Sequence, residues 1–258
     1  MKKTALLTMI LAALMLGGCS GRLSDEYITI DKYEGIEVEK AEVTDTTDEE
    51  IDKVVARMME GYTAQHDLPE DTKITDAIVK ETLSDTAETV EQYRLELKKQ
   101  IDAAKEKAAR TKVETKVWEK VIDNSEVKKY PADRLKEVEE NLKSQYEDYA
   151  KEAGTEYDAY MEALGMTNKD IEKAAKASVK QELAAEVLAN KYGLKPNEED
   201  FQTALEAYAD EYKFANVDLL LEAVPEEEMR LLVTQDNVKS WLADRCRLTE
   251  PSKKTEKE

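Results

Sequence analysis

The sequence predicts an all-α, or mainly α, fold with one or two short strands near the N-terminus. Apolar side chains recur at helical spacing through most of the chain. Capping residues, prolines and glycines divide the chain into segments of helical length. The 258 residues include only eight glycines, two phenylalanines and two tryptophans, which leaves little material for the turns and bulky core of a β-rich fold.

The first 19 residues have the layout of an export signal. Lys2 and Lys3 form a basic start, and the apolar run from Thr4 to Leu16 is too short to span a bilayer. The run closes on Leu16-Gly17-Gly18-Cys19, a spacing that resembles the bacterial lipobox. We therefore expect acylation of Cys19 with fatty acid such as palmitate, which would hold the chain at the extracytoplasmic face of the cell membrane. A short signal with an incidental cysteine is the alternative.

Residues 20–46 are expected to form a tether followed by a short strand segment. The first part, 20–26, is mostly polar. Apolar and polar residues then alternate at 28–30 and again at 36–38, the period of a half-buried strand. These strands would lie at an edge of the fold.

The first helix is predicted over 48–60. Thr47 and Glu50 have the spacing of a capping box, in which each side chain bonds to the backbone of the other residue. Apolar residues follow at helical spacing, and Gly61 predicts the end of the helix. His66, the sole histidine, would lie in the loop that follows.

Two further helices are predicted before residue 124. A short one covers 75–82. Thr89 and Gln92 then cap a long helix over 90–123, which keeps an apolar stripe on one side and charged residues on the other. One face of this long helix must pack against another part of the protein.

Proline and glycine divide the rest of the chain into shorter helices. Pro131 and Pro225 suit a first helical turn, and Gly154, Gly165 and Gly193 each follow a periodic apolar segment. The helices expected here cover 131–153, 155–164, 167–192, 198–214, 217–223 and 225–246. We expect one helical domain over 47–248 and a disordered tail over 249–258.

Composition excludes several classes of partner and site. The formal net charge is −20, and loss of Lys2 and Lys3 with the signal makes the chain more acidic still, so nucleic acid is not an expected partner. The same charge repels anionic lipid, which favours attachment through Cys19 over adsorption through a basic face. With one histidine, and Cys246 as the remaining thiol, no metal site of the usual ligands is expected. Cys246 is interpreted as a half-buried residue without a role.

Sequence motifs for catalysis are missing. Glycine-rich nucleotide loops, the serine hydrolase elbow and the zinc protease motif do not occur, so we expect neither an enzyme nor a cofactor. Glu139 with Glu140, and the run Glu226 to Glu228, have the composition of calcium or acid-base groups. A solvated helix face is the favoured interpretation of both.

An aromatic and thioether stripe is the candidate binding surface. It bends at Gly154, and tyrosine and methionine bind varied apolar segments of other polypeptides. Ordinary packing between helices is the alternative, because such stripes usually belong to a core. The candidate residues are Tyr146, Tyr149, Tyr157, Tyr160, Met161 and Met166.

An ordered series of segments resembles the trigger factor chaperone family from about residue 27 to 246. No single segment is as specific as a metal signature, and the order carries the resemblance. The segments are Tyr33-Glu34-Gly35-Ile36-Glu37-Val38-Glu39-Lys40, Asp48-Glu49-Glu50-Ile51-Asp52, Leu68-Pro69-Glu70, Thr89-Val90-Glu91-Gln92-Tyr93-Arg94, Tyr130-Pro131-Ala132 and Gly165-Met166-Thr167.

The resemblance implies an elongated multi-helix chaperone cradle with arm-like helical hairpins, similar in architecture to periplasmic parvulin-type chaperones. In the family, a prolyl isomerase domain separates the first segments, whereas here only Gly61 to Asp67 lies between Glu60 and Leu68. The family's basic ribosome-docking loop is also missing, so isomerase activity and ribosome binding are not carried over.

The resulting hypothesis is an ATP-independent holding chaperone for unfolded or newly exported polypeptides at the membrane surface. A scaffolding lipoprotein that binds one defined envelope partner is the alternative. An enzyme of unfamiliar design is a third and weaker interpretation.

Overall fold

The computed structural model describes residues 21–83 and 86–250. These residues form nine helices and five short strands, which confirms the mainly α fold class. The chain divides into two compact units, and residues expected to form one helical domain, 47–248, fall in both. The first unit combines the chain up to Ile36 with Lys120–Arg245, and the second combines Glu37–Glu119 with the chain from Cys246.

The first unit contains a small antiparallel sheet of three strands in the order β1-β2-β4. Ile28 of β2 pairs with Val127 of β4, and Ile30 pairs with Leu23 of β1. The alternation seen in the sequence does mark a strand. The expected half-buried edge strand is wrong, because Ile28, Thr29 and Ile30 are all buried and β2 lies between the other two strands. The strands are β1 (Leu23–Ser24), β2 (Ile28–Ile30) and β4 (Ser125–Val127).

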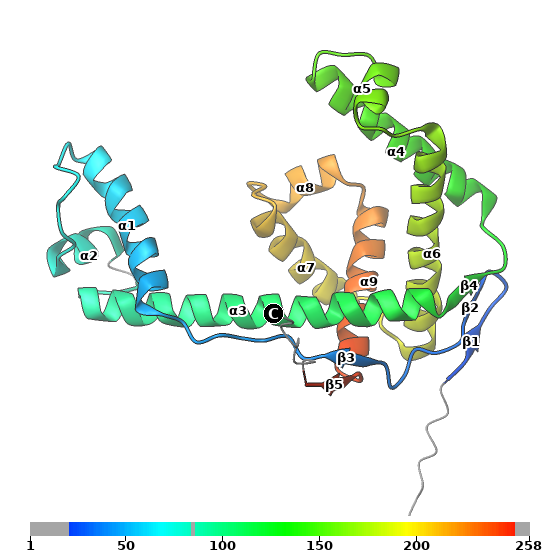
Figure 1. Ribbon diagram of the computed structural model, residues 1–258, viewed down its shortest axis with the longest axis horizontal. Coiled ribbons are helices and arrows are strands. Elements are labelled where there is room, and N and C mark those ends of the chain that lie inside the picture. The colour runs from blue at the N-terminus through cyan, green and yellow to red at the C-terminus, as the bar shows by residue number, and fades with distance from the viewer. Residues whose placement is uncertain (1–20, 84–85, 251–258) are drawn as a thin grey trace, which may run out of the picture. The chain divides into compact units, whose positions relative to one another are not determined.

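Six helices complete the first unit, and α6 contacts both α4 and α9 (Figure 1). Alanines 175, 184, 185 and 189 of α6 are buried, and small side chains let neighbouring helices approach closely. A separate apolar cluster joins α7, α8 and α9 around Phe201 and Met229. The six are α4 (Ala132–Glu152), α5 (Tyr157–Ala163), α6 (Asn168–Tyr192), α7 (Glu198–Glu211), α8 (Val217–Ala223) and α9 (Glu226–Ala243).

A single guanidinium ties α4 to α6 and α9. Arg134 of α4 donates to both oxygens of Glu182, at 2.9 and 3.0 Å, and to both oxygens of Glu228, at 2.6 and 2.9 Å. These bonds raise the pKa of Arg134 above its ordinary value. Glu228 was expected on a solvated face, and it instead holds α9 against α4, a link between distant residues that periodicity does not show.

The second unit pairs β3 (Glu37–Glu39) with β5 (Arg247–Thr249) in parallel. Only β3 was expected from the sequence, and β5 takes in Thr249, the first residue of the expected tail. The helices of this unit are α1 (Asp48–Gln65), α2 (Asp76–Leu83) and α3 (Val90–Asp123) as far as Glu119. An apolar core that includes Val55, Val79 and Tyr93 holds the three helices together.

Helix α1 runs four residues beyond Gly61, so the expected stop at this glycine is wrong. A glycine within a helix costs roughly 1 kcal/mol relative to alanine. The turn that follows it buries Thr63 and packs Tyr62 against the core, which outweighs that cost. The helix ends instead at Gln65, and Asp67 just beyond its cap has a φ of 50° and is followed by a bond from Leu68 N to Thr63 O of 3.0 Å.

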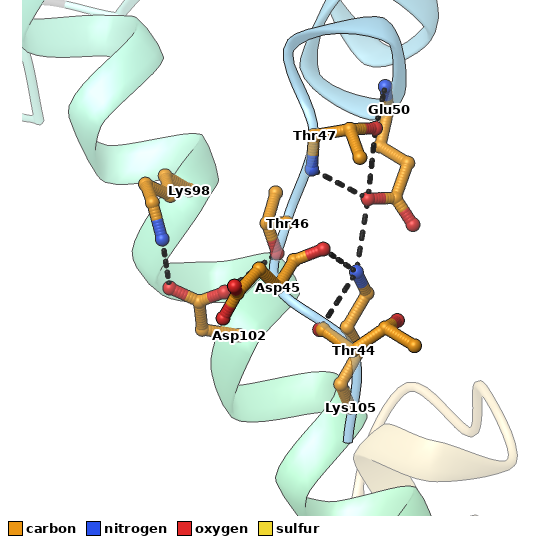
Figure 2. A network of polar contacts seen from close by, with 8 residues as sticks. All are labelled: Thr44, Asp45, Thr46, Thr47, Glu50, Lys98, Asp102 and Lys105. Atoms are coloured by element: carbon orange, nitrogen blue, oxygen red, sulfur yellow. Dashed lines mark hydrogen bonds and ion pairs between the residues drawn. The ribbon is translucent and has the colours of Figure 1, made fainter. Parts of the chain in front are cut away.

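A polar network holds the start of α1 against α3 (Figure 2). Lys105 donates to the carbonyl oxygens of Thr44 and Asp45, and to Glu50 at 2.9 Å. Thr46 donates to Asp102 at 2.6 Å. The capping box expected from Thr47 and Glu50 is present, with a Thr47 N to Glu50 distance of 2.8 Å.

Candidate functional site

Two left-handed glycines shape the bend between α4 and α6 in the first unit. Gly154 and Gly165 have φ values of 69° and 66°. After α4, Thr155 N donates to Ala150 O at 2.9 Å, and after α5 Met166 N donates to Met161 O at the same distance. Both helices thus end in the same type of glycine cap, and α5 sits as a short arm at the tip of α4 (Figure 1).

The start of α6 fixes the far side of the bend. Thr167 N and its hydroxyl donate to Asp170 at 2.8 and 2.7 Å. Tyr157 of α5 donates to Asn168 at 2.9 Å, which ties the short arm to the first turn of α6. The bend is therefore held by local backbone and side-chain bonds on both sides.

An open hollow of about 470 Å³ lies between α5 and the start of α6. Tyr157, Met161 and Met166 supply its apolar wall, Gly165 its backbone floor, and Asp158 and Glu162 stand at its edge. We call this the bend hollow. Burial and the nearby carboxylates of Glu147 and Asp158 raise the pKa of Tyr157 above its ordinary value.

The structure brings the six predicted residues together in two groups and leaves one apart. Tyr146 and Tyr149 form an edge-to-face pair on α4, with ring centroids 6.1 Å apart. Tyr157, Met161 and Met166 line the bend hollow, and half-buried Tyr160 belongs to neither group.

Burial separates the six residues further. Tyr149 is 42% exposed and Met161 is 4% exposed, and the other four lie between these limits. Tyr149 is thus available for binding, whereas the Met161 side chain is part of the packing.

A larger hollow in the second unit was not predicted. It has a volume of about 890 Å³ and lies between α1 and the segment 67–74. Its floor includes Val55, Met59 and Ile74, and we call it the acidic groove. Five carboxylates line it: Asp52, Glu60, Asp67, Glu70 and Asp71.

The α-helical spacing of Asp52, Ala56, Glu60 and Ala64 was the available signal for this groove. Residues four apart share one helix face, so acidic and small side chains alternate along one line of α1. The opposite wall comes from a loop whose course follows no period. The sequence could therefore indicate half of the groove at most.

The remaining predicted features are placed as follows. Cys19, the signal and residues 251–258 lie outside the described residues. Cys246 is half-buried. His66 caps the end of α1 and stacks on Tyr62, with ring centroids 4.2 Å apart.

Membrane-spanning helices and metal-binding groups are both absent from the part of the chain that the structure describes. None of the helices within 21–83 and 86–250 is long and apolar enough to cross a membrane. Over the same ranges, no group of three or more histidine, cysteine, aspartate or glutamate side chains is placed to hold a metal ion.

Curated relatives and a solved structure are trigger factors. The chain is 22% identical over 213 residues to the trigger factor of Streptococcus uberis, covering 80% of this chain and 47% of that protein. It is 28% identical over 129 residues to the trigger factor of Carboxydothermus hydrogenoformans, covering 48% and 30%. One solved structure similar to this chain is a trigger factor chaperone, described by its promiscuous substrate recognition in folding and assembly. It is 19% identical to this chain with a TM-score of 0.39, and the match covers 67% of this chain and 43% of the solved chain.

The chain spans about half the length, or less, of these curated relatives. A family model described as the C-terminus of bacterial trigger factor matches residues 89–244. This match includes α3 to α9, the Arg134 bonds and the whole of the bend hollow. Since it covers more than half of the sequence, the chain belongs to the family of the bacterial trigger factor C-terminus.

Proposed function

We propose that this protein is an ATP-independent holding chaperone that binds unfolded or newly exported polypeptides. The observation that carries the proposal is the family match over residues 89–244, which supports a chaperone role in protein folding. The proposals that the protein is exported and that it acts at the membrane surface rest on the N-terminal sequence. Nucleic acid and the ribosome are not among the proposed partners.

The bend in the first unit supplies the proposed binding surface. Tyr149, in the last turn of α4, is 42% exposed, and Leu164, which precedes Gly165 of the bend hollow, is 48% exposed. Aromatic and thioether groups offer large contact areas with little loss of side-chain entropy on binding. A chaperone with many clients needs such adaptable contacts more than it needs a shaped pocket.

The acidic exterior supports the holding role. A formal net charge of −20 keeps a complex with an apolar client soluble, because like charges on separate complexes repel each other. The proposed role needs neither a nucleotide nor a catalytic group, and we propose that the protein is not an enzyme.

The anchor is proposed from Cys19 alone. Two or three acyl chains on one residue give stable attachment, since each buried methylene contributes about 0.8 kcal/mol. In cells given labelled palmitate, we expect label on the protein and none on a Cys19→Ser variant, which should also leave the membrane fraction. A labelled, membrane-bound serine variant would contradict the lipoprotein proposal.

Aggregation suppression by the chain without residues 1–19 tests the holding role. We expect Tyr149→Ser to weaken suppression several-fold for unrelated clients, and to lower thermal stability no more than the Tyr212→Ser control does, since each variant loses one contact with a neighbouring tyrosine. Tyr212→Ser is the matched control, since Tyr212 is 61% exposed and lies outside the bend. Equal loss in both variants, or no loss in either, would remove the bend from the proposal.

The alternative is a scaffolding lipoprotein with one envelope partner. The same assay separates the two functions, because a scaffold would suppress aggregation of none of the unrelated clients. Capture of a single envelope protein, lost on mutation of a surface outside the bend, would favour the scaffold.

A further inference from the structure

The chain that follows the proposed anchor is docked on the first unit. A Cβ atom built on Gly21 would lie 2.6 Å from the Tyr33 hydroxyl, so the backbone of Gly21 lies directly against this ring. Gly21 is two residues from Cys19, and a chain spans at most about 3.3 to 3.6 Å per residue. The Cα atom of Cys19 is therefore at most roughly 7 Å from that of Gly21.

Tyr33 is the first of three connected aromatic rings. Its hydroxyl lies 2.9 Å from the hydroxyl of Tyr192, at the end of α6. The Tyr192 ring in turn lies against Trp241 of α9, with centroids 4.3 Å apart. Glu34 accepts from the Tyr192 hydroxyl at 3.0 Å, which fixes the orientation of that ring.

A cation lies over each of the second and third rings. Lys191 Nζ lies 5.8 Å from the centroid of the Tyr192 ring, and the Arg245 guanidinium lies 4.3 Å from that of Trp241. Lys191 and Arg245 are exposed, and both rings are half-buried. Tyr33 itself is buried, with 3% exposure, and its hydroxyl holds the Tyr192 ring in place from within the first unit. We call Lys191, Tyr192, Trp241 and Arg245 the anchor-side cluster.

We propose that the anchor-side cluster rests on the surface of the lipid bilayer and sets the orientation of the first unit there. Tyrosine and tryptophan suit the boundary between lipid tails and headgroups because each has an apolar ring and a polar edge. Lysine and arginine bind lipid phosphates. Glu34 offsets one of the two positive charges of this face. Since the whole chain carries −20, an anionic bilayer still repels this face less than it repels the acidic remainder of the chain.

This proposal rests on the lipid anchor of the proposed function, so its test must measure anchoring and orientation separately. Flotation of the full acylated protein with phosphatidylcholine and phosphatidylglycerol vesicles reads anchoring. Quenching of tryptophan by phosphatidylcholine with a doxyl group high on its acyl chain reads orientation. The sequence has two tryptophans, so Trp118→Phe leaves Trp241 as the sole emitter.

We expect Trp241 emission to shift to the blue on vesicles and to lose intensity with the shallow quencher. In the reciprocal variant, Trp241→Phe, emission from Trp118 should hardly change, because Trp118 is 5% exposed. Protein that floats while Trp241 remains unquenched would overturn the proposed orientation and leave the anchor standing. Protein that does not float would overturn the anchor and with it this inference.

Charge variants test the role of the two cations. Lys191→Gln with Arg245→Gln should reduce the quenching of Trp241, measured relative to the same protein without quencher. The control is Lys169→Gln with Lys173→Gln, at the opposite end of α6. Equal quenching in both pairs would overturn the role of the cations. If Trp241 emission changes with protein concentration and not with added vesicles, the cluster binds a second copy of the chain and the proposal is overturned.

Discussion

The bend hollow and the acidic groove differ more in their walls than in their size. The acidic groove is the larger, at about 890 Å³ against about 470 Å³, but five carboxylates line it. An apolar client segment would have to desolvate these charges, whereas the bend hollow has only two carboxylates, Asp158 and Glu162, and presents Tyr157 and Met166, with Met161 almost fully buried. Wall chemistry, and not volume, therefore makes the bend the better surface for varied unfolded chains.

The two regions also obtain their shape differently. The bend depends on two glycines with positive φ, which force the chain to turn at fixed points. Helix α1, the main wall of the acidic groove, contains a glycine that needs no special conformation. The apolar core holds this helix to α2 and α3, and the polar network around Lys105 fixes its first turn against α3 (Figure 2).

The largest expected effect is the loss of packing at Met161. Met161→Ala should lower the free energy of unfolding by about 2 to 4 kcal/mol, the range for large-to-small changes at buried sites. Urea denaturation of the first unit's transition measures it. The control is Met166→Ala, the same change at a half-buried position of the same hollow. If both variants lost equal stability, the hollow would be core throughout and would not be a binding surface.

Glycine-to-alanine changes should have opposite signs in the two regions. Gly154→Ala should destabilise the protein by about 1 kcal/mol, because alanine is strained at a φ of 69°. Gly61→Ala should stabilise it by about 0.5 to 1 kcal/mol, because Gly61 lies inside α1 with open space around it. Thermal unfolding of the two variants measures both, and a shift of the same sign in each would contradict the assigned backbone conformations.

Acid should weaken the attachment of α1 to α3. A bond from Thr47 N, followed by the bond from Lys105, lowers the pKa of Glu50 to about 2 from the ordinary 4.5. Lys98 and Thr46 lower the pKa of Asp102 in the same network. Because these folded-state pKa values are below the unfolded ones, the stability is fully present above about pH 4.5 and is lost as the pH falls towards 2.

A pH series of urea unfolding curves tests this expectation. The difference between the unmodified chain and Glu50→Gln should shrink between pH 5 and pH 2, since protonation removes what the substitution removes. Glu91→Gln, an exposed change at the start of α3, is the control and should show no such trend. A difference that stays constant down to pH 2 would rule out ionisation of Glu50 as its cause.

Local signals in the sequence predicted the elements of the fold well. The capping box at Thr47 and Glu50, and the start of α6 at Thr167 and Asp170, involve residues three apart, so the sequence contains the whole interaction. Strand β1 pairs with nearby β2, but it was missed because its two residues are too few to show an alternating pattern. Strands β4 and β5 were missed because each depends on a partner far along the chain, β2 and β3 respectively. The Arg134 bonds to Glu182 and Glu228 were missed for the same reason.

The candidate site could be predicted only in part. Periodicity found the tyrosines and methionines of the bend, but Gly154 and Gly165 reset the helical phase between them. After each reset, a pattern read along the sequence no longer says which side chain faces inward. Buried Met161 and exposed Tyr149 therefore looked alike, and three-dimensional packing alone distinguishes them.

The last prediction is that the protein has no effect in an assay of prolyl isomerisation. The resemblance to trigger factor implies an isomerase domain in the family where this chain has only Gly61 to Asp67. In the structure those residues complete α1 and turn into the wall of the acidic groove, a segment with a left-handed Asp67 and a 3.0 Å bond from Leu68 N to Thr63 O. We therefore expect no acceleration of a proline-limited refolding reaction by catalytic amounts of the protein. A full-length trigger factor serves as the positive control, and Asp71→Asn with Glu60→Gln as the variant that changes the groove. If the unmodified protein accelerates refolding and this variant does not, the acidic groove is catalytic. The comparison of the two hollows would then be reversed, because the acidic groove and not the bend hollow would be the active site.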